Sequence, residues 1–283
     1  MVLPISSPGS DAGLTRSHVS AFQKRVLEHY RRNGRTLPWR ATTEPYRILV
    51  SEIMLQQTQV DRVIPKFEAF ISRFPDAGAL AAAPLRDVLL MWQGLGYNRR
   101  AKALHRCAVI VTNEHGGRLP DTREGLQALP GIGPYTAAAV CVFAYNRPCV
   151  FIETNIRAVY IHCFFPEEDK VSDAQIEPLV AATLYKRNPR RWYNALMDYG
   201  AYLKKEHANP ARKSRHHSIQ GRFEGSDRQI RGMIITLLGK KTEMSMHELV
   251  RAIGREPARV QPIIDRLVRE ELVRRQRTRL SLP

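Results

Sequence analysis

Two acids of this chain stand among apolar residues, where a carboxyl group is costly unless it is hydrogen-bonded or paired. Glu52 precedes the apolar run Ile53, Met54 and Leu55, and Glu153 interrupts the stretch "CVFIETNIRAVY". A carboxyl group can donate a proton, accept one or stabilise a developing positive charge, and its surroundings decide which. For Glu52 the alternative is a glutamate on the solvent face of an amphipathic helix, and these residues alone leave both interpretations open.

A glycine turn lies between two helical patterns shortly before Glu153, in "LPGIGPYTAAA". Its two glycines permit backbone conformations that other residues avoid. The turn places backbone N–H groups at the start of a helix from Pro134, and this arrangement binds phosphate. A simple antiparallel helix pair joined by glycines is the alternative. The expected phosphate contacts are Pro130, Gly131, Ile132 and Gly133.

The charge of the chain indicates a polyanionic partner. The 283 residues include 44 Lys and Arg against 27 Asp and Glu, which gives a net charge of +17. A surplus of this size repels itself and is typical of proteins that bind nucleic acid. A ribosome-associated or merely basic protein is the alternative.

Cysteine usage and hydropathy indicate an intracellular protein. No apolar run approaches the roughly 18 residues that a membrane span needs, and the N-terminus lacks the pattern of a secretion signal. We therefore expect a cytoplasmic, nucleoid-associated protein with no membrane partner. Four cysteines lie in apolar stretches without a C-x-x-C pair, which indicates buried thiols in a reducing compartment. They are Cys107, Cys141, Cys149 and Cys163.

Helical periodicity dominates the chain up to about residue 203. Residues 1–16 are rich in Ser, Pro and Gly and predict a flexible tail. Residues 17–206 predict the main domain, since 17–34 and 45–74 carry apolar residues at helical spacing and clear strand alternation is absent. Residues 207–225 are polar, basic and broken by Pro and Gly, which predicts a linker.

The pattern changes after the linker, and residues 226–283 predict a second, smaller domain. Three helical segments, the last with Pro257 in its first turn, precede the basic ribbon "LVRRQRTRLSL". This order is typical of a winged helix-turn-helix. Residues 201–283 hold 19 basic and 9 acidic side chains, a net +10, so most of the surplus charge lies here. We expect this domain to contact DNA with a helix in a groove; packing on the main domain or dimerisation is the alternative.

Five segments occur in the order and spacing of a known enzyme family. They are "LPWR" (37–40), "PYRILVSEIMLQQTQVDRVIPKF" (45–67), "MWQGLGYNRRAKALH" (91–105), "LPGIGPYTAAA" (129–139) and "WYNALMDYGA" (192–201). Over residues 20–203 the chain resembles the helix-hairpin-helix (HhH-GPD) DNA glycosylase superfamily and, within it, the MutY-like adenine glycosylase branch. The resemblance implies an all-α, two-lobed glycosylase fold, which the winged helix with its short β-ribbon would follow.

The resemblance implies base excision repair on double-stranded DNA. A glycosylase flips a nucleotide out of the duplex and breaks the bond between base and sugar. Negative charge develops on the departing base and positive charge on the sugar, so a protonated acid and a carboxylate divide the work as in glycosidases. By its match to the family motif, Glu52 is expected to be the acid near the base. Poor solvation among its apolar neighbours favours the proton-bearing form.

Glu153 occupies the position of a family aspartate that faces the sugar. Its extra methylene displaces the carboxylate, and small displacements can cost large rate factors. Three explanations stay open: a shifted backbone compensates, the substrate or mechanism differs, or activity is lost. Asn155 matches a family asparagine and is expected to orient the carboxylate by hydrogen bonding. Asp198 in "MDYGA" is a weaker candidate for the second acid, because that motif more often belongs to helix packing.

Tyr135 predicts a monofunctional enzyme. Lyase-active relatives carry a lysine at this position, whose amine attacks the sugar and forms a Schiff base. Tyrosine cannot form that adduct, so we expect the abasic site to stay intact and disfavour a bifunctional glycosylase and lyase.

Two further segments match DNA contacts of the family. Gln56 and Gln57 lie in the segment that enters the duplex or surrounds the extruded base, and Tyr97 matches an aromatic near the opposite strand. Helix packing with exposed polar ends is the alternative. A basic cluster without apolar cover follows. The expected phosphate contacts in it are Arg99, Arg100 and Lys102.

Two departures from the family bear on cofactor and substrate. Most relatives carry four cysteines that hold an iron–sulfur cluster after the helix matching "WYNALMDYGA", whereas "YLKKEHANPARKSRHH" contains none. We therefore expect no cluster, and we expect His207, His216 and His217 in a solvated basic loop instead of a metal site. The hairpin leaves room for a monovalent cation. The expected winged helix stands in place of the Nudix-like C-terminal domain with which MutY recognises oxidised guanine.

The sequence thus predicts a monomeric, monofunctional DNA glycosylase without a resident cofactor. Adenine in a mispair is the leading target, and uracil, thymine or another deaminated or damaged base stays open. A DNA-structure-binding protein on a retired glycosylase scaffold, or a winged-helix regulator, is the alternative of another class. The intact "SEIMLQQT" argues against it, and Glu153 leaves it open.

Overall fold

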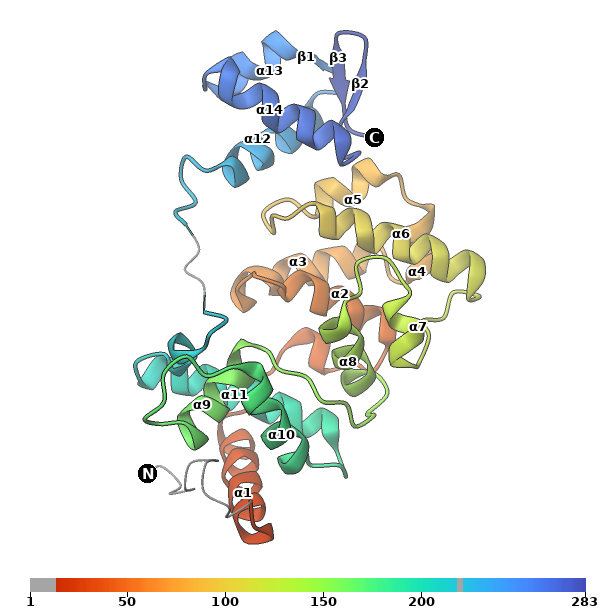
Figure 1. The fold of residues 1–283 in the computed structure, drawn as a ribbon. Coiled ribbons are helices and arrows are strands. Elements are labelled where there is room, and N and C mark those ends of the chain that lie inside the picture. The colour runs from red at the N-terminus through yellow and green to blue at the C-terminus, as the bar shows by residue number, and fades with distance from the viewer. Residues whose placement is uncertain (1–13, 218–220) are drawn as a thin grey trace. The chain divides into compact units, whose positions relative to one another are not determined.

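The computed structural model describes residues 14–217 and 221–283, and helices dominate it (Figure 1). The chain forms two compact units. Unit 1 comprises residues up to 45, 121–124 and 133–219, and unit 2 comprises 46–120, 125–132 and 220–283. Across the described ranges no helix is both long and apolar enough to cross a membrane. The mostly helical fold with one small sheet agrees with the fold class predicted from the sequence.

Unit 1 has a helical core built on aromatic side chains. Phe22 packs edge-on against the rings of Tyr160, Phe164 and Trp192 at centroid distances of 5.1–5.8 Å, a geometry that aromatic pairs prefer. The first helix begins after the cap Thr15 and ends at Gly34, close to the predicted bounds. The helices are α1 (Arg16–Asn33), η1 (Pro38–Arg40), α8 (Pro134–Phe143), α9 (Thr154–Phe164), α10 (Asp173–Thr183), α11 (Pro189–Glu206) and η2 (Pro210–Lys213), where η marks a 3₁₀ helix.

The most extensive helix pair of unit 1 joins α9 and α11. At their crossing, a Cβ atom on Gly200 would lie 2.2 Å from the carbonyl oxygen of Asn155. Only glycine fits this approach, so the "MDYGA" motif serves close packing against the first turn of α9.

The segment after α11 holds more structure than the linker predicted for 207–225. The N–H of Val171 donates to the carbonyl of Lys213 (2.8 Å), and the N–H of Arg215 donates to the carbonyl of Val171 (2.9 Å). Ala211 and Ser214 are buried. Main-chain pairing with a distant loop, which composition does not reveal, therefore keeps residues 207–217 on unit 1.

Unit 2 contains the segment that the sequence predicted as helical over 45–74. This segment forms two helices, because Gln57 adopts a left-handed backbone with φ of 54° and ends the first of them. The helices of this part are α2 (Pro45–Leu55), α3 (Val60–Arg73), α4 (Ala77–Ala82), α5 (Leu85–Met91) and α6 (Arg99–Glu114). A short helix, α7 (Arg123–Gln127), spans the boundary between the units.

The C-terminal part has the element order of a winged helix. It runs α12 (Asp227–Lys240), β1 (Met244–Ser245), α13 (Met246–Ile253), α14 (Pro257–Arg269), β2 (Arg274–Gln276) and β3 (Arg279–Ser281). The sheet has the antiparallel order β1-β3-β2, with Leu280 opposite both Met244 and Arg275. Gly254, with φ of 66°, ends α13, and Pro257 begins α14 as predicted. The two-residue strand β1 carries no sequence signal and was not predicted.

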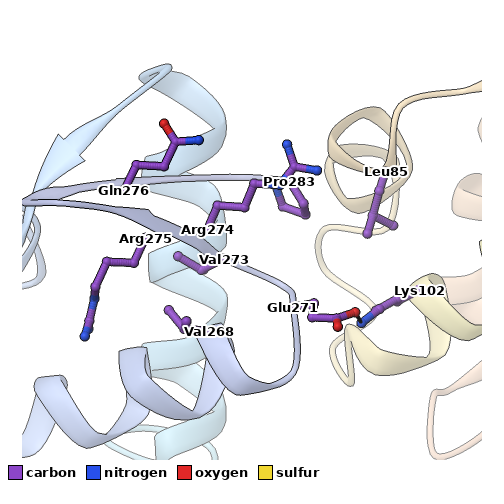
Figure 2. A pocket seen from close by; sticks show the side chains of 9 residues that line it. All are labelled: Leu85, Lys102, Val268, Glu271, Val273, Arg274, Arg275, Gln276 and Pro283. Carbon is purple, nitrogen blue, oxygen red and sulfur yellow. Dashed lines mark hydrogen bonds and ion pairs between the residues drawn. The ribbon is translucent and has the colours of Figure 1, made fainter.

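The winged helix packs on the other helices of unit 2 and belongs to that unit. The compact units therefore do not follow the domain boundary that the sequence predicted at residue 206. Helix α12 lies beside α5 (Figure 1). Arg86 Nη2 donates to the carbonyl of Gly239 (2.9 Å), and a Cβ on Gly239 would come within 2.3 Å of Leu90 Cδ2. Figure 2 shows the open pocket of about 480 Å³ that remains there, with Leu85 and Lys102 across from the β2–β3 hairpin.

Candidate functional site

Glu52 is a buried carboxyl group within α2. Its residue is 5% exposed, and its neighbours Ile53 and Met54 are buried with it. Every residue of α2 from Ile48 to Met54 is buried, so the helix has no solvent face at this point. The solvent-face interpretation of Glu52 is therefore wrong, and the side chain belongs to the interior of the fold.

The loops that follow α2 and precede α6 share a single guanidinium, that of Arg100. Because its Nη atoms bind backbone oxygens from both loops, they hold the two loops in one arrangement within unit 2. Burial lowers the pKa of Arg100 to about 10. Its acceptors are the carbonyls of Ile53 (2.6 Å), Met54 (3.2 Å), Gln56 (2.6 Å), Leu95 (3.1 Å) and Gly96 (3.2 Å), and Oγ1 of Thr58 (3.3 Å).

This environment corrects the expectation for Arg100. The sequence predicted an uncovered side chain in contact with phosphate, whereas the guanidinium is partly buried and its two Nη atoms already donate to five backbone oxygens and the Thr58 hydroxyl. Its Cζ also lies 5.6 Å from the ring centre of Trp92 and 5.4 Å from that of Tyr97. Arg100 thus positions the loops, and a phosphate would have to replace existing hydrogen bonds.

Gln57 and Tyr97 stand on these two loops in left-handed backbone conformations, with φ of 54° and 49°. Non-glycine residues held this way cost on the order of 1 kcal/mol each and gather at functional sites. Both residues are exposed, Tyr97 to 42%. The strained backbone therefore presents an amide and a phenol outward from one unit, side chains suited to entering a base stack. Gln56, which precedes Gln57, is half-buried.

Arg99 and Lys102 pair with acids of the winged helix. Arg99 Nη2 lies 2.5 Å from Glu270 Oε1, and Lys102 Nζ binds the Glu271 carboxylate and donates to the Glu270 carbonyl (2.8 Å). Arg231 of α12 holds the other oxygen of Glu270. The expectation of a bare basic cluster is therefore wrong, because these partners lie more than 160 residues away in sequence, although the Arg99 side chain stays 68% exposed.

The glycine turn has the backbone that the sequence predicted. Gly131 has φ of 78°, and a Cβ there would lie 2.6 Å from Ala103 Cβ. Both the backbone conformation and the close contact therefore require glycine. Ile132 is buried and anchors the turn, while Gly131 and Gly133 are exposed. Gly133 caps α8 without a side-chain hydrogen bond. This arrangement leaves the start of the helix open to an anion.

Tyr135 lies in the first turn of α8, against an aromatic stack. Its ring meets Phe151 edge-on at 5.5 Å, and Phe151 stacks on Tyr193 at 4.0 Å. Tyr193 Oη in turn donates to the carbonyl of Cys149 (2.8 Å). The phenol is half-buried in this wall, so the residue is compatible with a pocket lining and supplies no amine.

Glu153 caps α9 with its own side chain. Its Oε1 accepts the N–H groups of Asn155 (2.8 Å) and Ile156 (3.0 Å), and its Oε2 accepts Nδ2–H of Asn155 (3.2 Å). The hydrogen bond expected from Asn155 is therefore present. Three donors fix the carboxylate at a helix N-terminus, which favours negative charge. The extra methylene lets the side chain curl back onto its own helix.

Lys204 is a site residue that sequence reasoning missed. It lies one helical turn after Gly200 on α11 and is half-buried. Burial lowers the pKa of Lys204, and the negative charge of Glu153 opposes that shift. The signal available in the sequence was the spacing Gly200 to Lys204, which places both on one helix face directed at the start of α9.

Asp198 forms a buried cluster with two arginines. Its Oδ1 lies 2.7 Å from Arg35 Nε and 2.8 Å from Arg40 Nη2, and its Oδ2 accepts the Arg35 N–H and Arg40 Nη1–H, both at 2.8 Å. Burial alone would raise the pKa of Asp198, but the hydrogen bonds and charges of Arg40 and Arg35 hold it below its ordinary value. Both oxygens are occupied, so Asp198 supports the fold.

The thiols do not form an iron–sulfur ligand set. Cys141 and Cys149 contact each other, Cys163 lies on α9 and Cys107 on α6 of the other unit. Burial raises the pKa of Cys107 and of Cys163 to about 12, as expected of thiols enclosed by apolar side chains. In the part of the chain that the structure describes, no group of three His, Cys, Asp or Glu side chains could hold a metal.

Comparisons with known proteins give a consistent result. Residues 50–181 match the family described as HhH-GPD superfamily base excision DNA repair protein. Adenine DNA glycosylase of Mycolicibacterium smegmatis is 37% identical over 235 residues, 77% of this chain and 80% of that protein. Adenine DNA glycosylase of Mycobacterium tuberculosis is 46% identical over 135 residues, 47% of this chain and 44% of that protein.

The fold comparison agrees. A solved thermostable thymine-DNA glycosylase has a TM-score of 0.57 and 26% identity over 65% of this chain and 86% of its own. Glu52, the glycine turn and Glu153 all lie inside the stretch that matches the family.

Proposed function

The chain belongs to the HhH-GPD superfamily of base excision DNA repair proteins and is a DNA glycosylase, and from this premise we propose that it removes adenine from a mispair in duplex DNA and leaves the abasic site intact. The similar curated proteins are adenine DNA glycosylases, which supports adenine as the target. The proposed enzyme acts as a monomer on nucleoid DNA in the cytoplasm and carries no iron–sulfur cluster.

The burial of Glu52 is the observation that carries this proposal. An acid enclosed in an apolar helix is suited to hold a proton until a base nitrogen takes it, since low solvation disfavours the charged form. Protonation of the departing base neutralises the negative charge that develops as the glycosidic bond breaks. Glu52 is therefore assigned as general acid.

Glu153 supplies the negative charge that stabilises the sugar cation. Its carboxylate is fixed by Asn155 and the start of α9, so it needs no reorganisation when positive charge appears on the sugar. The same group can orient the water that attacks the sugar carbon.

Tyr135 supports hydrolysis without strand cleavage. A phenol in the wall of aromatic rings cannot form a Schiff base with the sugar, whereas an amine at this position could. Water is then the nucleophile, and the product is an unbroken strand with an abasic site.

Several backbone and side-chain groups are assigned to DNA. The exposed glycine turn binds a phosphate of the strand that carries the flipped nucleotide. The loops of Gln57 and Tyr97 enter the duplex, and Gln56 borders the extruded base. A monovalent cation at the turn is compatible with the proposal but is not needed for the chemistry.

Thymine is the second candidate target. The solved thymine-DNA glycosylase matches 65% of this chain with the TM-score of 0.57, and its identity of 26% is enough to keep that base in view. A duplex with adenine opposite guanine or oxidised guanine and a duplex with thymine opposite guanine separate the two targets directly.

The test uses labelled duplexes with adenine, thymine, uracil or a damaged base in the mispair. Treatment with protein and then alkali should cut the adenine duplexes, and omission of alkali should leave every strand whole. Glu52→Gln should slow base release by on the order of 10²–10⁴-fold, the usual worth of a positioned general acid. Glu68→Gln, at an exposed position of α3, is the matched control and should match the parent.

Three outcomes would contradict the proposal: cutting before alkali, no cutting of any duplex, or a Glu52→Gln variant as fast as the parent. The proposed lack of an iron–sulfur cluster is tested by absorbance: the purified protein should show no visible band of bound iron and sulfide. A stoichiometric band would contradict this part of the proposal.

A further inference from the structure

The β2–β3 hairpin of the winged helix exposes four arginines within six residues. Residues 272–283 contain no acid, and every residue from Arg274 to Arg279 is exposed. Arg277 forms the tip, in a left-handed backbone with φ of 53°. We name this set the wing arginines; its members are Arg274, Arg275, Arg277 and Arg279.

We propose that the wing arginines bind the phosphate backbone of the duplex beside the mispair, as a second DNA contact outside the glycosylase site. The inference rests on the proposed function in one respect, that duplex DNA is the substrate. Guanidinium groups match phosphate geometry and suit a partner that carries one charge in each nucleotide.

Two acids of the winged helix that precede the wing are engaged elsewhere and do not face the wing arginines. Glu270 and Glu271 bind Arg99, Arg231 and Lys102 at the contact with the α6 end of unit 2. These pairs neutralise Glu270 and Glu271 at the contact of the domain with α6. The positive charge of the wing arginines is therefore not neutralised by these two acids.

Two wing arginines do have acidic neighbours. Arg275 pairs with Asp265 of α14 (2.6 Å), and Arg279 with Glu248 of α13 (3.2 Å), all four side chains being at least 38% exposed. Exposed pairs of this kind contribute little and are screened by salt, so a phosphate can share or replace the acid. Among the described residues, Arg277 and Arg274 make no ion pair.

Docking of the domain makes such a contact productive. Gly239 packs on Leu90, Arg86 holds the Gly239 carbonyl, and Lys102 faces Glu271 across the pocket in Figure 2. The wing and the loops of Gln57 and Tyr97 therefore belong to one compact unit. A duplex held by the loops meets the wing at high effective concentration instead of as a separate binding event.

The test compares the full-length parent with a triple variant, Arg275→Ala, Arg277→Ala and Arg279→Ala. All proteins carry Glu52→Gln so that no base is released during binding. A matched control removes the same charge from exposed positions of α1, with Lys24→Ala, Arg31→Ala and Arg32→Ala. Affinity is measured against salt concentration on a long duplex with a central mispair, and on the same mispair with both flanks cut back.

On the long duplex the triple variant should bind about tenfold more weakly. Its slope of log affinity against log salt should fall by about 0.9 for each phosphate that the variant no longer neutralises. On the short duplex it should equal the parent, and the α1 control should equal the parent on both. A second variant with lysine at the three positions keeps the charge and should restore most of the slope.

An unchanged salt slope on the long duplex overturns the proposal, as does an equal loss of affinity on both duplexes. Wing-dependent binding of an acidic protein with unaltered DNA binding also overturns it and assigns the surface to that partner. The two proposals fail separately: if the protein with its native Glu52 cuts no duplex in the cleavage assay but the wing effect is present in the binding assay, the proposed function falls and the wing contact stands.

Discussion

At the scale of single residues, Glu153 shows how a longer acid can occupy the place of a shorter one. The additional methylene is absorbed by curling the side chain back, so that Oε1 reaches two backbone N–H groups of α9. The Asn155 side chain donates the third hydrogen bond, to Oε2. This geometry fixes the carboxylate, and substitution of the residue distinguishes the three explanations for it.

Substitution of Glu153 separates its cap from its chemistry. In Glu153→Gln the amide oxygen can still accept the two N–H bonds, so the free energy of unfolding should change by less than about 1 kcal/mol. Base release should nevertheless fall by on the order of 10²-fold or more, because the negative charge opposite the sugar is lost. Single-turnover rates and denaturant unfolding measure the two effects.

Glu153→Asp is the matched control for this pair. Aspartate is a good N-cap and keeps the charge, so its rate should lie much nearer to the parent than that of the amide. A Glu153→Gln enzyme as fast as Glu153→Asp would remove the carboxylate from the mechanism.

At the scale of elements, Arg100 joins the loop after α2 to the loop before α6. One guanidinium satisfies backbone oxygens at the end of α2 and before α6, where Gln57 and Tyr97 keep strained backbones. Strain of this kind persists only where neighbouring structure fixes it. The positions of Gln57 and Tyr97 therefore depend on a residue outside the exposed surface that these two side chains form.

Arg100→Lys should expose this dependence. Lysine has three donors and no planar fork, so several of the six acceptors lose their partner and the variant should lose about 2–4 kcal/mol of stability. Its affinity for a mispaired duplex should fall, while the single-turnover rate at saturating DNA should change less. Thermal melting and duplex titration check this.

Arg106→Lys, at an exposed position of α6, controls for the substitution itself and should behave as the parent. If Arg100→Lys melts with the parent and binds the duplex equally well, the loops do not depend on the guanidinium.

Sequence reasoning succeeded where one short motif determines the local structure. The stop of α1 at Gly34, the turn at Gly131 and the start of α14 at Pro257 were predicted because capping and turn conformations depend on residues close in the chain, although the cap of α1 is Thr15 instead of the expected serine. The motif "SEIMLQQT" likewise located Glu52, although the sequence alone could not show that the helix has no solvent face.

Prediction failed where the deciding partner is distant in sequence. Arg99 and Lys102 looked uncovered because Glu270 and Glu271 lie about 170 positions later, and only the fold brings them together. Residues 207–217 looked like a linker because their composition does not show that Lys213 and Arg215 pair with the backbone of Val171. Composition describes the residues of a segment but not what lies opposite it.

At the scale of the whole molecule, the buried Asp198 couples stability to acid pH. Its carboxylate joins the start of the chain, through Arg35 and Arg40, to α11 near the end of unit 1. Since the folded-state pKa is depressed, the cluster contributes its full stability above the unfolded pKa of this aspartate. That contribution is lost as the pH falls through the folded value, below the ordinary 3.8.

Asp198→Asn should therefore cost about 3 kcal/mol of unfolding free energy at neutral pH, because two partly buried guanidiniums lose their counter-ion. The difference from the parent should shrink at pH values below about 4, where the parent begins to protonate the same group. Denaturant unfolding across this range measures it, with the exposed Asp169→Asn as control. A difference that does not vary with pH would contradict the assignment.

The ion pairs that dock the winged helix also predict that two distant parts of the chain vary together among related proteins. If the domain were exchanged for another, Arg99 and Lys102 would lose their acids, and Leu90 would lose the contact with Gly239. Related chains should therefore vary these positions in step: an acid at 270 should accompany a cation at 99, and both should disappear where the C-terminal domain is of another kind.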